Sequence, residues 1–182
     1  MIKIIGGDYR SRNIETPDSA TTLPTKNMVR GAMLSSLGDR IEGARVLDLF
    51  AGSGALGIEA LSRGAASCLF VEKDRAAYQI VVKNLASLRE TKGEVLNSDY
   101  RAALERAKKE GRVFDIVFLD PPYAMKGAYQ EAVDFLLDNS MLGEEATLIL
   151  EYEGDLPFHS DLPFQREYKY GKTKVLALRR SL

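Results

Sequence analysis

Val46-Leu47-Asp48-Leu49-Phe50-Ala51-Gly52-Ser53-Gly54-Ala55-Leu56-Gly57 is the stretch that decides the fold of this chain. It begins as a short apolar strand, passes through a glycine turn with the pattern G-x-G-x-x-G, and continues into a helix. Glycine has no Cβ and tolerates positive φ, so the backbone of such a turn can approach a ligand closely. The free N–H groups at the start of the following helix point at that ligand. The stretch therefore predicts a ligand site at one end of a parallel sheet.

Two acidic residues indicate which ligand binds there. Glu72 follows Gly52 by 20 residues, at the end of the apolar run 68–71, where a carboxylate would bind the hydroxyls of a ribose. Asp48 ends the strand before the turn, where its carboxylate can accept hydrogen bonds from the turn amides and lie near a cationic ligand. S-adenosylmethionine (SAM) carries a sulfonium and an ammonium, whereas the pyrophosphate of a dinucleotide would be repelled. The pattern therefore favours SAM over a nicotinamide or flavin cofactor.

The composition indicates a soluble globular protein. The chain has 182 residues, of which 45% are hydrophobic and 28% charged, so it can bury a substantial core in one domain. The single cysteine, Cys68, excludes a disulfide within the chain, and it is expected to be a core residue of a protein from a reducing cytoplasm. No apolar run approaches the length of a membrane span, and the N-terminus lacks a secretory pattern. We expect a cytoplasmic monomer that contacts no membrane.

The distribution of charge is more informative than the net charge of −1. Residues 166–182 contain six basic residues against one acid, and further basic residues lie near the N-terminus, whereas acids concentrate in residues 144–161. Such an asymmetry suits a protein with one face toward a polyanion, although ordinary solvated charge gives the same pattern. On the first interpretation, the phosphates of such a polyanion are contacted by Arg10, Arg12, Arg30, Lys172 and Lys174.

The chain before the glycine turn predicts an appendage and a helix. Residues 1–24 predict a small β-arm outside the main sheet, in which Arg10 and Arg12 alternate along a strand and therefore point from the same face. Residues 25–37 predict a helix with Thr25 as its N-cap. Its apolar stripe is expected to consist of Val29, Met33 and Leu37, widened by Met28 and Ala32.

From residue 45 onward, apolar runs alternate with helical patterns. Alternating strands and helices predict a parallel, doubly wound α/β sheet with right-handed crossovers, and Asp74 is a candidate helix N-cap. Two strand-like segments near the C-terminus predict a hairpin, which gives a seven-stranded sheet an antiparallel edge. The expected strands are 45–49, 67–71, 93–96, 114–119, 146–151, 165–170 and 174–178, and the expected helices are 55–63, 74–89, 100–109 and 128–139. We expect one domain over residues 1–182, with the arm 1–24 attached to a core of residues 25–182.

Asp120-Pro121-Pro122-Tyr123 is the second motif that carries chemistry, and the apolar strand 114–119 delivers it to the carboxyl edge of the sheet. The prolines fix φ and remove N–H donors, leaving carbonyl groups to face outward. A planar amino group is a poor nucleophile because its lone pair is delocalised into the ring. Asp120 can accept one of its N–H bonds and the Pro121 carbonyl the other, which aims the nitrogen at a methyl donor. Tyr123 would stack on the ring.

Other polar residues are weighed against structural roles. Asp99 follows the third strand and either accepts the adenine amino group or caps the helix 100–109, and Tyr100 would lean on the adenine ring. His159 is expected on the surface, and no metal site is expected. The full set of expected cofactor contacts is Asp48, Phe50, Ala51, Gly52, Ser53, Gly54, Gly57, Glu72, Lys73, Asp99 and Tyr100.

The chain resembles class I SAM-dependent methyltransferases with a Rossmann-like fold, and more closely the RsmD family, which methylates guanine N2 in small-subunit (16S) ribosomal RNA. The resemblance runs nearly end to end. It rests on Ile5-Gly6-Gly7 with Arg10 and Arg12, Pro24-Thr25 with Val29-Arg30, the segments 49–57 and 59–65, Asp120-Pro121-Pro122-Tyr123, and Tyr170-Gly171 with Thr173. It implies SAM as cofactor and ribosomal RNA or a small-subunit assembly particle as partner. It also implies that Thr25 and Arg30 lie near the target nucleotide.

The chain departs from the family pattern at Ser11, Leu23, Asn27, Met28 and Gly31. These positions lie in the arm and the first helix, so they bear on the RNA target rather than on methyl transfer.

Four functions remain in competition. The leading hypothesis is guanine-N2 methylation of 16S ribosomal RNA. The second keeps the chemistry but places the methyl group on adenine N6 of RNA or DNA, or on a protein glutamine. The third is a catalytically idle module that binds SAM or RNA, and the fourth is a nicotinamide oxidoreductase. The intact Asp-Pro-Pro-Tyr motif argues against the idle module, and together with Asp48 it argues against the oxidoreductase.

Overall fold

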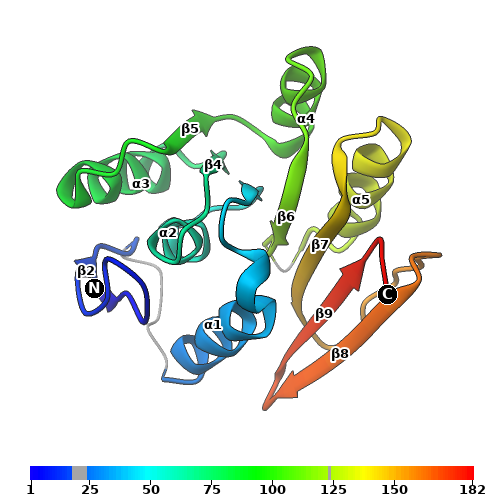
Figure 1. The fold of residues 1–182 in the computed structure, drawn as a ribbon, viewed down its shortest axis with the longest axis horizontal. Helices are drawn as coiled ribbons and strands as arrows, with labels where there is room; N and C mark the ends of the chain where they lie inside the picture. Colours follow the sequence, from blue (N-terminus) through cyan, green and yellow to red (C-terminus); the bar gives the residue numbers. More distant parts are fainter. Residues whose placement is uncertain (18–23, 123) are drawn as a thin grey trace.

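A seven-stranded sheet forms the centre of the molecule (Figure 1). The structure is a computed structural model that describes residues 1–17, 24–122 and 124–182, with only the backbone for Pro24 and Thr25. The strand order is β5-β4-β3-β6-β7-β9-β8, and β9 runs antiparallel to both of its neighbours while the other pairs are parallel. The strands are β3 (Arg45–Asp48), β4 (Ser67–Glu72), β5 (Gly93–Asn97), β6 (Phe114–Leu119), β7 (Leu142–Glu153), β8 (Phe164–Tyr170) and β9 (Thr173–Arg179).

Helices cover both faces of the sheet, so the core has two halves. On one face α1, α2 and α3 pack with the N-terminal arm, and on the other face α4 and α5 pack (Figure 1). Strand residues alternate between the two halves: Val46 and Phe118 join the first, Leu47 and Leu119 the second. The helices are α1 (Pro24–Leu37), the short 3₁₀ turn η1 (Gly38–Arg40), α2 (Ala55–Ser62), α3 (Arg75–Leu88), α4 (Tyr100–Lys109) and α5 (Ala128–Asp138).

The predicted α/β fold is confirmed, with small differences at the ends of elements. Asp74 caps α3 by accepting a hydrogen bond from the Ala77 N–H at 2.9 Å, as predicted. β7 is longer than predicted because pairing with β9 continues to Glu153. The predicted cap of the first helix is wrong, because α1 begins at Pro24 and thus contains Thr25; proline suits a first helical position, where an N–H is not needed.

The apolar stripe of α1 also differs from the prediction at one residue. Val29, Met33 and Leu37 are buried as expected. Met28 is 58% exposed, and Leu34 takes its place in the core with no exposed surface. Met28 and Leu34 lie on different sides of the helix, and the residue pattern alone did not show which side faces the sheet.

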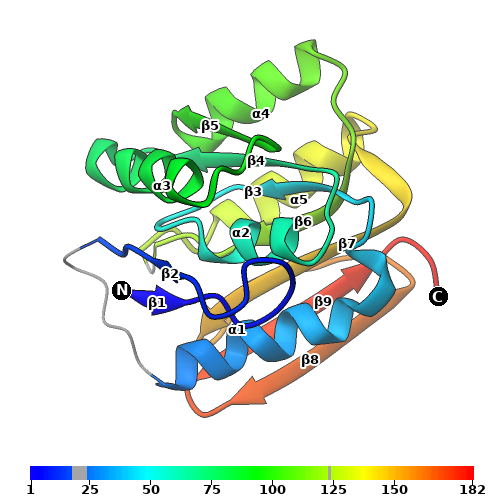
Figure 2. The same ribbon diagram turned by 60° about the vertical axis from the view of Figure 1, so that its left-hand side comes forward.

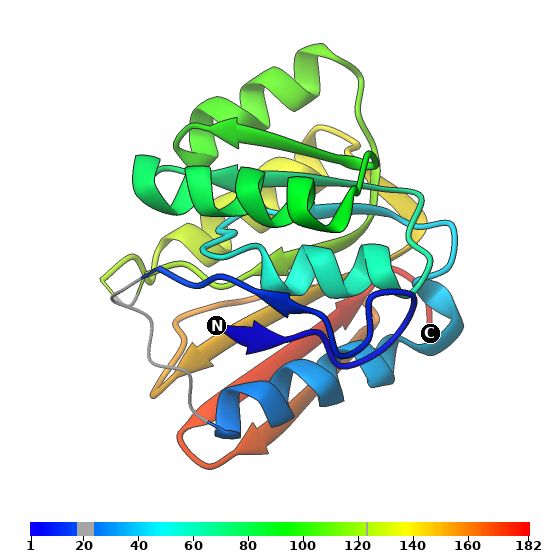
Figure 3. The same ribbon diagram turned by 90° about the vertical axis from the view of Figure 1, so that its left-hand side faces the viewer.

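The N-terminal arm is a hairpin of β1 (Ile2–Lys3) and β2 (Asn13–Ile14) that lies beside α1 and α2 (Figures 2 and 3). The loop between its strands contains Arg10 and Arg12, and Arg10 lies in a turn. The prediction that the two arginines alternate along one strand is therefore wrong. Arg12 instead donates a hydrogen bond to the Ser87 carbonyl of α3 at 3.1 Å, and Ser11 between them has a φ of 68°.

A short segment of α2 holds the arm in place. The buried Glu59 accepts the N–H of Gly6 at 3.4 Å and also that of Ile5. The Ser62 hydroxyl donates to the Gly6 carbonyl at 2.6 Å and accepts the Tyr9 N–H at 2.9 Å. These contacts link the segment 59–65 to the glycines of the arm, because the arm backbone lies so close to α2 that there is no room for a side chain.

Gly7 shows how close that approach is. A Cβ on Gly7 would lie 2.0 Å from the Ser62 carbonyl oxygen, and the Gly7 φ is +76°. Both facts exclude another residue at this position without movement of the arm.

No helix in the described part of the chain is long and apolar enough to cross a bilayer.

Candidate active site at the carboxyl ends of the strands

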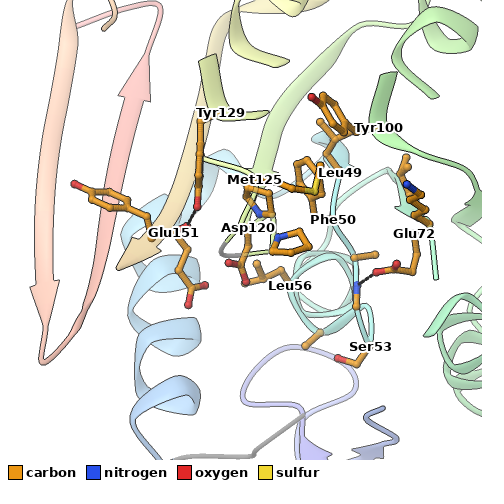
Figure 4. A pocket seen from close by; sticks show the side chains of 18 of the residues that line it. Leu49, Phe50, Ser53, Leu56, Glu72, Tyr100, Asp120, Met125, Tyr129 and Glu151 are labelled. Atoms are coloured by element: carbon orange, nitrogen blue, oxygen red, sulfur yellow. Dashed lines mark hydrogen bonds between the residues drawn. The ribbon is translucent and has the colours of Figure 1, made fainter. Parts of the chain in front are cut away.

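A cavity of about 660 Å³ lies at the carboxyl ends of the parallel strands. This is the edge at which open α/β sheets bind ligands. The glycine turn and the ends of β4 and β6 form part of its wall, the end of β7 forms another, and Ile2 and Thr16 of the arm close one side. Figure 4 shows that Glu72 and Ser53 lie on one side of this cavity and Asp120 and Glu151 on the other.

Glu72 is tied to the glycine turn. Its carboxylate accepts the Gly52 N–H at 2.9 Å and the Asp74 N–H at 2.8 Å (Figure 4). The side chain lines the cavity, and each oxygen keeps a free lone pair because a carboxylate offers about four acceptor positions. Lys73 also lines the cavity. The geometry is compatible with the predicted ribose contact of Glu72.

The three glycines of the turn have different roles. Gly52 and Gly54 adopt positive φ, +58° and +83°, which favours glycine. Gly57 has an ordinary φ, but a Cβ there would lie 2.3 Å from Phe70 Cε1 and 2.7 Å from Cys68 Sγ. Gly57 is thus required for α2 to pack on β4. Only Gly52 of the three lines the cavity. Gly54 and Gly57 have structural roles in the turn and in packing, and their cofactor contacts stay predictions.

Asp48 also lies behind the cavity wall rather than on it. The side chain is 2% exposed, and its carboxyl accepts the Gly57 N–H at 3.1 Å. The hydrogen bond to the turn was predicted; Asp48 does not line the cavity among the described residues, and its place near a cationic ligand stays a prediction. Burial, with a smaller contribution from the Glu72 charge, raises the pKa of Asp48 to about 7. Asp48 supports the turn from within.

Aromatic side chains form the wall on the α4 side. The Phe50 and Tyr100 rings lie 5.3 Å apart at 47° (Figure 4), and both residues line the cavity. The Tyr100 hydroxyl donates to Glu131 at 2.6 Å, and burial together with this hydrogen bond raises the pKa of Tyr100 to about 12. Asp99 caps α4 by accepting the Ala102 N–H at 2.9 Å, which confirms the structural alternative for Asp99. Because Asp99 also lines the cavity, the cap and a contact with adenine are compatible.

Asp120 and the prolines after it lie on the far side of the cavity from the glycine turn (Figure 4). The Asp120 side chain is surrounded by protein but open to the cavity. Its pKa is raised well above the usual range, first by these surroundings and then by the charge of Glu151. The Pro122 carbonyl accepts the Met125 N–H at 2.8 Å and closes a turn. Tyr123, the predicted stacking residue, lies outside the described residues.

Glu151 and Lys26 are among the charged residues of this cavity that the sequence reasoning missed. Glu151 ends the apolar run 148–150 of β7, and Lys26 lies in the first turn of α1. Burial raises the pKa of Glu151, and Lys26 opposes that shift. Glu151 could have been found by the rule that identified Asp120, because both acids directly follow a buried strand segment. Lys26 could not, because nothing in the pattern of α1 shows which of its residues reach the sheet edge.

The residues predicted to contact RNA do not form one group. Arg30 is 8% exposed; its guanidinium donates to the Lys3 carbonyl at 2.7 Å and lies 3.5 Å from Glu59. Arg30 also lines the cavity, so its phosphate contact stays a prediction, with part of its charge balanced by Glu59. Arg10 and Lys172 are exposed. Lys174 donates to the Gly154 carbonyl at 3.0 Å beside the Tyr152 ring.

The hairpin turn that carries Lys172 lies at the same edge of the sheet as the cavity, because Thr173 pairs with Glu153 at the end of β7.

The single histidine, His159, is 82% exposed, as predicted, and Cys68 is buried in the core, also as predicted. Over the described ranges, no group of three or more His, Cys, Asp or Glu side chains is placed to hold a metal ion.

The fold, the glycine turn and a cavity that ends at an Asp-Pro-Pro segment define a class I, SAM-dependent methyltransferase. A family model described as "Conserved hypothetical protein 95" matches residues 2–179. The chain belongs to this family, the RsmD family of methyltransferases.

Curated relatives and a solved structure agree with this assignment. The chain is 43% identical over 153 residues to "Ribosomal RNA small subunit methyltransferase D" of Escherichia coli strain K12. The matched region covers 84% of this chain and 75% of the relative. It is 37% identical over 179 residues to "Putative rRNA methyltransferase YlbH" of Bacillus subtilis strain 168, covering 96% of each. Among solved structures, "Putative methyltransferase yhhF from Escherichia coli" matches with a TM-score of 0.86 and 38% identity, covering 100% of this chain and 98% of that one.

Proposed function

We propose that this protein transfers the methyl group of SAM to the exocyclic N2 amino group of a guanine in 16S ribosomal RNA. The observation that carries the proposal is the position of Asp120, whose carboxyl faces a cavity bounded on its other side by the glycine turn and Glu72. A methyl donor held at the turn and an amino group held at Asp120 would meet inside this cavity. The E. coli relative, whose name states action on small-subunit ribosomal RNA, supports the choice of RNA.

The cofactor is proposed to lie along the glycine turn. Glu72 would accept hydrogen bonds from the ribose hydroxyls, as an acid at this position of a Rossmann-like fold does. The adenine would lie against Phe50, with Tyr100 supporting Phe50 from behind and Asp99 near the adenine amino group. Ala51 and Ser53 line the cavity from the turn itself. SAM, when bound, supplies an electrophilic methyl group on its sulfonium.

The chain's own contribution to the chemical step is to hold and orient the amino group. The target base must leave its stack to enter a cavity at the strand ends. Asp120 accepts one N–H bond and the Pro121 carbonyl the other, so the nitrogen becomes pyramidal with its lone pair toward the methyl carbon. The N–C bond forms as the S–C bond breaks, and the nitrogen then releases a proton. The raised pKa of Asp120 suits it to receive that proton. Tyr123 is proposed to stack on the base.

The RNA would approach over the arm and the hairpin turn of β8 and β9. Arg10 and Lys172 are exposed, and phosphate contacts from them would orient the RNA without reading its sequence. Arg12 and Lys174 can add charge to the same approach, although each also binds a backbone carbonyl. Thr25, at the start of α1, is proposed to lie beside the target nucleotide. We further propose that the protein is a cytoplasmic monomer that uses no metal.

Product analysis tests the proposal directly. Small-subunit particles and naked 16S RNA from a strain without the corresponding enzyme are incubated with the protein and labelled SAM, and the labelled nucleoside is identified by digestion and mass spectrometry. N2-methylguanosine is expected. N6-methyladenosine would replace the proposed substrate with adenine, and label in protein rather than RNA would replace it with glutamine. Absence of any transfer would favour the idle binding module.

The role of Asp120 is tested by single-turnover methylation at saturating SAM. Asp120→Ala is expected to slow the step by about 10²–10³, by analogy with the loss of one oriented group from an oxyanion hole. Affinity for S-adenosylhomocysteine should change little, because the cofactor lies at the glycine turn. Asp115→Asn is the matched control: Asp115 is on the same strand but pairs with Arg45 at 2.9 Å, away from the cavity. A near wild-type rate for Asp120→Ala would show that the segment 120–122 is only structural.

A further inference from the structure

Asp120 and Glu151 are neighbours on adjacent parallel strands. Leu119 of β6 is paired in register with Leu150 of β7, so the next residues, Asp120 and Glu151, stand beside each other at the strand ends. Both leucines belong to the half of the core covered by α4 and α5. Because successive side chains point to opposite faces, the two acids point toward α1. Figure 4 shows the two side chains on the same side of the sheet.

The two carboxyl groups face the cavity. Among the described residues, neither side chain receives a hydrogen bond, and Lys26 of α1 is an opposing charge that acts on both. The rest of the strand is fixed: the Tyr129 hydroxyl donates to the Glu151 backbone carbonyl at 2.5 Å (Figure 4). The strand end that carries Glu151 is thus held in place, while its carboxyl is free to bind a ligand that donates hydrogen bonds.

Guanine presents two adjacent groups of donors on one edge, the N1–H and the 2-amino group. If the 2-amino group is held by Asp120, the N1–H lies next to it and requires a second acceptor. Adenine presents a lone pair at N1 instead, and an ionised carboxylate beside that lone pair would repel it. A second acid next to Asp120 is therefore useful for guanine and unfavourable for adenine.

We propose that Glu151 selects guanine by accepting the N1–H of a base whose 2-amino group is bound by Asp120. This inference rests on the proposed function and adds a specificity-determining residue to it. Lys26 lies close enough to affect both acids, and its positive charge favours the ionised form of Glu151 that the contact requires. Glu151 takes no part in bond making.

The test uses 2,6-diaminopurine, which keeps the 2-amino group of guanine but has a lone pair at N1. The nucleotide that the protein methylates is first mapped, and reconstituted particles then carry either guanine or 2,6-diaminopurine at that position. Single-turnover rates are measured for the wild type, for Glu151→Gln and for Glu145→Gln. Glu145 is an exposed acid near the other end of β7, so it controls for loss of charge from the same strand.

The wild type should methylate guanine about 100-fold faster than 2,6-diaminopurine, because the analogue leaves a charged acceptor without its donor. Glu151→Gln should reduce this ratio to about 10-fold or less, because the amide can donate to the lone pair at N1. Glu145→Gln should keep the wild-type ratio. Thermal stabilisation by S-adenosylhomocysteine confirms that each variant is folded.

The outcomes separate this inference from the proposed function. If N2-methylguanosine forms but Glu151→Gln keeps the wild-type ratio, Glu151 does not select the base and the inference fails alone. A wild type that methylates both bases equally well would also overturn it. A mapped product other than N2-methylguanosine overturns the proposed function itself, and with it the reason for a contact to N1–H.

Discussion

Asp48→Asn is expected to make the free energy of unfolding less sensitive to pH. In the folded chain Asp48 is buried and its pKa is about 7, against an ordinary value of 3.8. Between these two values the folded state holds a proton that the unfolded state has released, so the contribution of Asp48 to stability falls as pH rises. The loss is complete above about pH 7. Asparagine has the same shape, cannot ionise, and still offers an oxygen to the Gly57 N–H.

The magnitude follows from the linkage between pKa and stability. Each pH unit between the two pKa values changes the free energy of unfolding by about 1.4 kcal/mol per group. From pH 5 to pH 7 the wild type should therefore lose about 2 kcal/mol relative to Asp48→Asn, less than two full pH units would give, because Asp48 is half ionised in the folded state at pH 7. Other acids with raised pKa values, Asp120 and Glu151 among them, titrate in both proteins, so the difference removes their effect except for the small part of the Asp120 shift that the Asp48 charge causes.

Urea unfolding at pH 5, 6, 7 and 8 measures this difference. The chain has no tryptophan, so far-UV circular dichroism is the suitable signal. Asp115→Asn serves as control: its hydrogen bond and ion pair with Arg45 hold the pKa of Asp115 below the usual value, and this variant should differ from the wild type by a constant amount over the range. If the difference between wild type and Asp48→Asn is equally constant, Asp48 does not change its ionisation on folding and the reasoning is refuted.

Two further predictions concern packing and RNA. Gly57→Ala should destabilise the protein by about 1–3 kcal/mol in urea unfolding, because its Cβ would meet Phe70 Cε1 at 2.3 Å. Gly31→Ala in α1, where the nearest atom is Ile5 Cδ1 at 3.4 Å, should be neutral or stabilising by about 0.5–1 kcal/mol; equal effects of the two changes would contradict the steric argument. Arg10→Ala and Lys172→Ala should each weaken RNA binding and reduce the magnitude of the slope of log K against log salt by about 0.7–0.9. The affinity for S-adenosylhomocysteine should not change. Filter binding at several salt concentrations measures the slope, and an unaltered slope would show that RNA does not bind at Arg10 and Lys172.

The sequence predicted the sheet well because its signals are local. Each buried parallel strand is a short apolar run, and each helix has a repeat of 3.6 residues, so the order of strands and helices could be read directly. The glycine turn and the Asp-Pro-Pro segment were placed correctly for the same reason: both directly follow such runs, and the ends of parallel strands meet at one edge of the sheet.

Prediction from the sequence is limited where a residue's surroundings depend on distant parts of the chain. Arg30 looks like a phosphate ligand in a basic segment, and only the packing of α1 against α2 shows that Glu59 neutralises it. Asp48 occupies the predicted position, but the direction of its side chain depends on Gly57, nine residues further on. Met28 illustrates the same limit for an apolar residue, since its exposure depends on how α1 is rotated toward the sheet.

The way the arm is fastened has a consequence for the order in which the chain assembles during translation. The arm is made first, but its partners follow much later: Ser62 binds Gly6 across 56 residues, and Asn84 of α3 binds the backbone of Glu15 across 69. A nascent chain can therefore attach its arm to α2 first, but the contacts of the arm with Asn84 wait until α3 has left the ribosome. The same Asn84 donates to the Ser53 carbonyl of the glycine turn at 3.0 Å. Asn84 thus joins the arm to the glycine turn, and the cavity closes only later, when β6 and β7 supply its far wall.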